Sequence, residues 1–216
     1  MKKIALFVCM LIIGFVNAQE NDQNSSSDKL NFAKGTSFVN GGIFLNSTNT
    51  ETTTTLEQED SRFGFGINSS YAYAISDDLF IGLGLGYIRN KRENDIPGSP
   101  VQETTSDTFR IFPYIRYYKG IGKRLAFFVQ GETQFSTGKT KSNGEDFIDT
   151  NSFFIGARPG LTYMVSKCLA IETTIGALGY TSEKLENRQN NAESDAKGFN
   201  FSLNTSNLVF GLSYYF

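Results

Sequence analysis

Five charged residues fall where they could act together. Polar and apolar residues alternate in the segments around them, and the charges lie on the polar side of that alternation: Arg110, Arg116, Glu132, Arg158 and Glu172. Guanidinium and carboxylate groups satisfy each other's charge when they are removed from water. Such a set could close the interior of a protein with ion pairs, or it could line a narrow ion pathway. We expect the structural role.

The sequence contains no histidine. This excludes Ser/His/Asp and Cys/His catalysis, and it removes the most common transition-metal ligand. Gly138-Lys139-Thr140 has the form of the end of a phosphate-binding loop, but Thr133 stands where that loop needs a glycine. We therefore expect no enzyme, no catalytic residue and no cofactor.

The acidic segment from Glu51 to Asp60, which includes Glu57 and Glu59, lacks the spacing of an EF-hand loop. A specific metal site is therefore not predicted there. The segment is interpreted as a solvated loop. A weak divalent-cation or lipopolysaccharide-associated site, or a contact surface, is the alternative.

The elements that carry the five charges are strands, because apolar and polar residues alternate with a period of two. In 79–89, Leu79, Ile81, Leu83, Leu85 and Tyr87 alternate with Gly82, Gly84 and Gly86. Small residues on one face suit a narrow barrel with bulky neighbours. Eight alternating segments are predicted, at about 36–45, 62–75, 79–89, 108–118, 125–137, 152–165, 169–180 and 208–216.

The connections between these segments alternate in length. Short turns occupy 76–78, 119–123 and 166–168, whereas long polar connections occupy 46–61, 90–107, 138–151 and 181–198. Short turns on one rim and long loops on the other are typical of membrane barrels. The pattern predicts an all-β fold, an eight-stranded antiparallel up-and-down transmembrane β-barrel.

The turn at 119–123 also predicts a register. If Tyr118 lies opposite Arg124, then Arg110 lies opposite Glu132. Opposite charges on facing strands would satisfy each other inside the barrel. Eight strands leave an interior only wide enough for side chains, so diffusion of nutrients through the lumen is not expected.

The chain ends in a strand with one strongly apolar face, formed by Leu208, Phe210, Leu212, Tyr214 and Phe216. Such a face suits a closed barrel in a membrane, which has no aggregation-prone edge. The strand resembles the C-terminal signal of bacterial outer-membrane barrels. That resemblance implies recognition of Phe210, Leu212, Tyr214 and Phe216 by the barrel-assembly machinery.

The amino-terminus has the pattern of a secretory signal, with Lys2 and Lys3 before an apolar run and Val16-Asn17-Ala18 as a cleavage site. We expect 1–18 to be removed and 19–34 to be a flexible periplasmic segment. Cleavage would leave 18 basic residues against 22 acidic ones, a net charge of −4, which argues against nucleic acid as a partner. Cys168 would be the remaining cysteine, so no disulfide is expected.

From about residue 35, the chain resembles the eight-stranded outer-membrane barrel family of OmpA-like and OmpX-like proteins. The resemblance rests on the signal, the strand count, the alternating connections and Phe216. It implies a barrel domain at 35–216 without a peptidoglycan-binding domain, in the outer membrane of a Gram-negative bacterium. Its partners would be lipid, lipopolysaccharide and an unknown extracellular ligand.

The expected function is non-enzymatic, either envelope integrity or surface interaction such as adhesion through four outer loops. Two alternatives remain. The first is a narrow, mostly closed ion channel. The second is a soluble secreted barrel that binds an apolar ligand, which would require the large apolar residues to point inward.

Overall fold

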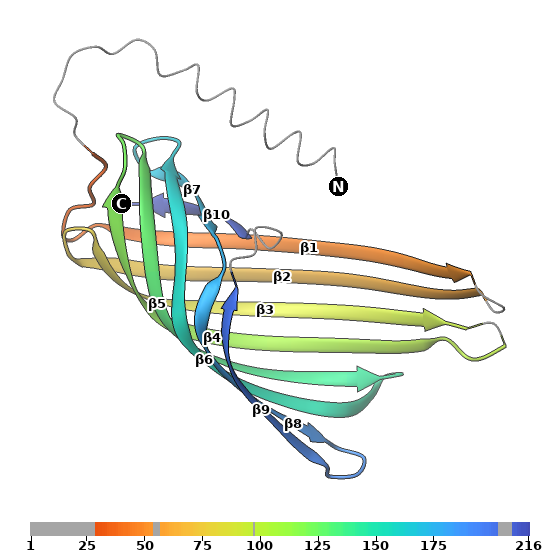
Figure 1. The fold of residues 1–216 in the computed structure, drawn as a ribbon. Helices are drawn as coiled ribbons and strands as arrows, with labels where there is room; N and C mark the ends of the chain where they lie inside the picture. Colours follow the sequence, from red (N-terminus) through yellow and green to blue (C-terminus); the bar gives the residue numbers. More distant parts are fainter. Residues whose placement is uncertain (1–28, 54–56, 97, 203–208) are drawn as a thin grey trace.

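The computed structural model describes residues 29–53, 57–96, 98–202 and 209–216, and these are mostly strand (Figure 1). Within these ranges there are ten strands: β1 Ser37–Thr53, β2 Glu57–Ser76, β3 Leu79–Asp95, β4 Gln102–Gly120, β5 Leu125–Ser142, β6 Glu145–Met164, β7 Leu169–Thr174, β8 Ala177–Asn187, β9 Glu193–Ser202 and β10 Val209–Tyr215. In this part of the chain, no helix is long and apolar enough to cross a membrane. The predicted signal at 1–18 lies outside the described residues.

Eight strands close into a ring at the end of the molecule that carries the short turns. Each of β1 to β7 and β10 is hydrogen-bonded to two neighbours within this ring, because β5 pairs with β6 and β10 pairs with both β1 and β7. All the pairings are antiparallel. The predicted eight-stranded antiparallel barrel is therefore confirmed.

The seventh predicted strand, 169–180, is divided in two. Gly176 has a φ of +110°, a conformation that side chains with a Cβ rarely adopt, and it separates β7 from β8. Near the short turns, Gly160 to Met164 of β6 pair with β7. Farther from these turns, Ile148 to Ala157 of β6 pair with β8, so β6 continues past the break.

Beyond the ring, on the side of the long hairpins, two strands are paired on one side only in the described part of the chain. From Ile43 to Thr53, β1 pairs with β2 alone. β9 pairs with β8 alone. Figure 1 shows that the hairpins extend far from the ring and that β8 and β9 diverge from β1.

The four polar connections predicted as loops are largely strand, and this part of the prediction was wrong. The β1–β2 ladder continues to Thr53 and Glu57, and the β3–β4 ladder continues to Asn94 and Gln102. Above a membrane both faces of a hairpin meet water, so a strand there needs no apolar face. For this reason the polar composition of these segments gave no indication that they are strands.

The ring has an apolar exterior, and its interior holds both polar and aromatic side chains. On β3, Ile81, Leu83 and Leu85 are exposed at 48%, 49% and 58%, whereas Phe80 is completely buried. Aromatic residues that include Tyr117 extend this outer surface around the other strands. An apolar surface of this extent around a closed sheet is suited to a lipid environment.

Candidate functional site

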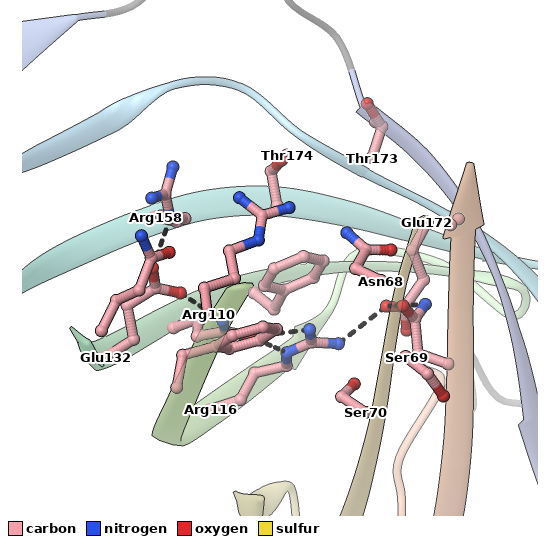
Figure 2. A pocket seen from close by; sticks show the side chains of 17 residues that line it. Asn68, Ser69, Ser70, Arg110, Arg116, Glu132, Arg158, Glu172, Thr173 and Thr174 are labelled. Atoms are coloured by element: carbon pink, nitrogen blue, oxygen red, sulfur yellow. Dashed lines mark hydrogen bonds and ion pairs between the residues drawn. The ribbon is translucent and has the colours of Figure 1, made fainter. Parts of the chain in front are cut away.

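Two ion pairs lie in the lumen: one crosses it from β4 to β7, and the other joins the neighbouring strands β5 and β6. Arg116 Nη1 lies 2.8 Å from Glu172 Oε2, and both side chains are less than 10% exposed. Arg158 Nε lies 2.7 Å from Glu132 Oε1, with the Glu132 side chain 3% exposed and Arg158 31% exposed. Four of the five predicted charges are thus joined in pairs, as Figure 2 shows.

Gln130 connects the two pairs into one polar network. Its Oε1 accepts hydrogen bonds from Nε and Nη2 of Arg116 at 2.9 and 2.7 Å. Its Nε2 donates to Glu132 Oε2 at 2.7 Å. Because both ends of the Gln130 amide are used, Arg116 and Glu132 each gain a neutral partner beside the ionic one.

Tyrosine hydroxyls complete the surroundings of Glu172. Tyr215 donates to Glu172 Oε1 at 2.7 Å, and Tyr118 donates to the same oxygen at 3.2 Å. Thr162 donates to it at 3.3 Å. These three partners were not predicted from the sequence, although Tyr118 and Tyr215 lie on the inward-facing side of the alternation in their strands. A carboxylate with this many donors can remain charged away from water.

Arg110 does not lie opposite Glu132, so that predicted pairing was wrong. The turn is centred two residues later than predicted, because the backbone N–H groups of Ile121 and Gly122 both donate to Leu125 O. Tyr118 therefore faces Phe128, and Arg110 faces Ser136.

The glycines of β3 provide the space for the large inner side chains of β4. Gly82, Gly84 and Gly86 lie opposite Tyr114, Phe112 and Arg110 respectively. A Cβ added at any of these glycines would collide with the side chain opposite. The inner side chains of β4 therefore lie flat across β3.

An aromatic floor fills the lumen on the side of the short turns. It consists of Phe38, Phe80, Tyr118, Phe128 and Tyr215, all at most 4% exposed. The guanidinium carbon of Arg116 lies 4.2 Å from the ring centre of Phe128, so the polar network rests directly on the floor.

The end of the predicted flexible segment, 29–34, packs beneath this floor instead. Phe32 is 5% exposed, and its ring stacks on Tyr215 at 4.8 Å between centres. Asp78 anchors it, since Phe32 N donates to Asp78 Oδ1 at 2.8 Å. Leu30 N donates to Gly122 O at 2.8 Å. Lone apolar residues in a polar stretch gave little sign of this packing.

A small cavity of about 140 Å³ lies above the floor. Its walls include all five predicted charges. It is the place where the structure brings Arg110, Arg116, Glu132, Arg158 and Glu172 together (Figure 2).

The predicted C-terminal signal residues lie on the outside of β10. Phe210, Leu212, Tyr214 and Phe216 are 50–63% exposed. The backbone of Phe216 extends the β1–β10 ladder that closes the ring, because its N–H donates to Ser37 O and its carbonyl accepts from Ser37 N. Their role in assembly remains a prediction.

The acidic outer segments form ion pairs at the rim. Asp60 Oδ2 lies 2.8 Å from Nη2 of both Arg62 and Arg92. Hydrogen bonds from Arg62 and then Arg92 lower the pKa of Asp60 to about 2. In the fourth outer segment, Lys184 pairs with Glu193 at 2.9 Å. Among the described residues, no group of three acidic or cysteine side chains could hold a metal ion.

Solved structures of outer-membrane proteins resemble this chain. OprG from Pseudomonas aeruginosa aligns with a TM-score of 0.52 at 10% identity, covering 85% of this chain and 97% of OprG. Neisserial surface protein A aligns with a TM-score of 0.48 at 16% identity, covering 85% and 100%. Ail of Yersinia pestis aligns with a TM-score of 0.42 at 13% identity, covering 85% and 99%.

No protein-family model matches the chain, and no curated protein matches its sequence. At 10% identity, the likeness to OprG is one of fold and not of activity. Together with the closed antiparallel ring, the polar lumen and the apolar exterior, it shows that this chain has the fold of the small outer-membrane β-barrels.

Proposed function

We propose that this protein is a non-enzymatic outer-membrane barrel that binds an extended segment of an extracellular polypeptide along its outer hairpins. The observation that carries the proposal is the free edge of β1. From Ile43 to Thr53 this strand has a neighbour on one side only in the described part of the chain.

The edge of β1 from Ile43 to Thr53 has few of the features that usually protect an edge strand, and Glu51 is its one charged residue. Residues 43–53 contain no proline, lysine or arginine, and their ladder with β2 has no bulge. Threonine, serine and asparagine predominate, and 46–50 are exposed. An edge of this kind offers unpaired backbone groups to another strand.

The second free edge differs. β9 carries Glu193, Asp195 and Lys197 along its length. Charges on an edge strand oppose pairing with further strands. The contrast favours β1 as the binding edge. Addition of a strand there would use backbone hydrogen bonds for affinity and side chains for selectivity.

The lumen favours binding at the hairpins over transport. The aromatic floor and the segment from Leu30 to Phe32 fill the ring on the side of the short turns. An open pathway would require both to move. The narrow-channel alternative therefore has less support than surface interaction.

The proposal is tested with a displayed random peptide library and the full-length protein folded in detergent micelles. Selected peptides should protect the β1 amides from hydrogen exchange. Replacing Ser47 and Asn49 together by lysine should weaken binding about tenfold or more, because charges would then flank the edge.

The control for this experiment is Asn90→Lys. Asn90 is exposed but lies on β3, which is paired on both sides, with Gly64 on β2 and Ser106 on β4. This variant should bind the peptides as the parent does. The proposal fails if the library yields no binder, or if the β1 double variant binds as tightly as the parent.

A further inference from the structure

Arg110 is a cation to which the described part of the chain offers no hydrogen-bond or ion-pair partner. Its Nε is buried without an acceptor among the described residues. Figure 2 shows the side chain extending toward Thr174 and not toward Glu132 or Glu172. The residue as a whole is half-buried, and a buried N–H group that lacks an acceptor is costly.

The barrel holds Arg110 in this position. Gly86 lies directly opposite, and the guanidine Nε and the side-chain carbons of Arg110 occupy the space where a Cβ would stand. The Arg110 guanidinium is therefore held against the inner surface of the barrel, because three glycines of β3 leave room for the inward-pointing side chains of β4.

The charges around the cavity do not cancel. Its walls carry three arginines and two glutamates. Glu132 is already paired with Arg158, and Glu172 is already paired with Arg116. The remaining positive charge is that of Arg110.

The cavity has space and polar groups for a small anion. Its volume of about 140 Å³ is several times the ~30 Å³ share of one water molecule in the liquid. Asn68 lines it with a buried Oδ1 that has no partner, and an amide that turns over presents donors instead. Thr174 and Gln134 also line it.

The cavity is reached from the side of the long hairpins. Toward the aromatic floor, Arg116 and Gln130 are 6% and 5% exposed. Away from the floor, the side chain of Arg158 is 31% exposed. An ion in the external medium therefore has a shorter route than one at the short turns.

We propose that this cavity binds one small oxyanion, a phosphate or a carboxylate, with Arg110 as its cationic partner. A guanidinium presents two parallel donors that match two oxygens of such a group. The site is independent of strand addition at β1, so either proposal can fail without the other.

The test is calorimetric titration of the full-length, detergent-folded protein with inorganic phosphate at constant ionic strength. One phosphate per chain should bind saturably. Arg110→Gln should weaken binding about tenfold or more, because a charge-assisted hydrogen bond is lost. Arg124→Gln, at an exposed turn position, should leave it unchanged. Acetate as a competitor separates the two ligand types: displacement assigns the site to carboxylates as well, and no displacement assigns it to phosphate alone.

A second variant separates binding from misfolding. Glu132→Gln removes one negative charge and frees Arg158 from its ion pair, so phosphate should bind more tightly. A folding defect would not produce that gain. The proposal is overturned if the parent binds no phosphate saturably, if Arg110→Gln binds equally well, or if Glu132→Gln binds more weakly.

Discussion

At the scale of single residues, the lumen shows how buried charges become tolerable. Arg116 is bound by Glu172, Gln130 and Tyr118 at once, and its guanidinium also rests on Phe128. Each donor has an acceptor, so the desolvated charges are matched. Arg110 departs from this pattern, and the departure motivates the anion site.

Arg116→Met should destabilise the barrel by about 3–5 kcal/mol, because Glu172 would be left buried and charged without its cation. The double variant with Glu172→Gln should cost less than the sum of the single changes. Unfolding in urea in lipid vesicles measures both.

A matching cycle for Glu132 should show stronger coupling with Arg158 than with Arg110. The reverse order would contradict the observed register of β4 and β5.

The Asp60 ion pairs at the rim should depend on pH in a defined window. The pKa of Asp60 is lowered from 3.8 to about 2, so the pairing contributes fully above pH 3.8 and is lost as the pH falls through about 2. Carboxyl carbon NMR of Asp60 measures this midpoint. Arg92→Gln should raise it, since one of two guanidinium donors is removed. An unshifted midpoint near 3.8 in the parent would show that the pairs do not form.

At the scale of elements, two features decide how the lumen is filled. The glycine row of β3 admits the flat side chains of β4. The segment from Leu30 to Phe32 covers the aromatic floor from below. Neither feature belongs to one strand alone, because each depends on what lies opposite.

Gly84→Ala should destabilise by about 1–3 kcal/mol, because its Cβ would meet the ring of Phe112 and force it aside. Gly122→Ala is the control, since a Cβ there meets no atom within 4 Å. Equilibrium unfolding of both variants provides the comparison. Adding Phe112→Leu should recover part of the lost stability. Equal stability of the two alanine variants would show that the row is not tightly packed.

Phe32→Ala should cost about 3–5 kcal/mol, as for other buried phenylalanines. Lys29→Ala, which changes an exposed residue of the same segment, should be nearly neutral. Hydrogen exchange of the Leu30 and Phe32 amides offers a second measurement, because both are hydrogen-bonded to the barrel turns. Rapid exchange and no loss of stability would restore the expectation of a flexible segment.

At the scale of the whole molecule, the chain divides into a closed ring and an open set of hairpins. The ring buries the aromatic floor and the polar network. The hairpins are held by backbone ladders and exposed ion pairs, such as Lys184 with Glu193. Exposed ion pairs contribute little stability, so the ring should determine folding.

Removing 182–198, which includes most of β8 and β9, should therefore leave a folded ring. The expected result is an unboiled band that still runs faster than the boiled one on a gel of the outer-membrane fraction. Removing Phe216 should instead reduce the folded yield, because the backbone bonds to Ser37 that extend the β1–β10 ladder would be lost. Loss of the fast band in the hairpin variant would mean that β8 and β9 belong to the stable core.

Much of the fold was accessible from the sequence because alternation is a local property. The alternation of Leu83 and Leu85 with Gly84 assigned each residue to a face, and the structure confirms those faces. The short turns are likewise a local feature of the sequence, and their positions predicted the end of the molecule at which the ring closes. The strands of the hairpins were not predicted, because a strand with water on both faces needs no alternation of apolar and polar residues.

Alternation along the chain was sufficient to place the strands of the ring, to assign their side chains to the inner or outer face and to predict that the five charges point inward. Tertiary structure alone decided which charges meet. A shift of the turn by two residues moved Arg110 from Glu132 to Ser136, because the hydrogen bonds of the turn fix the register of a hairpin and strand alternation does not specify them. It also decided that Phe32 covers the floor, since that contact joins the chain's beginning to Tyr215 near its end. Contacts between distant segments leave no periodic pattern in the residues that make them.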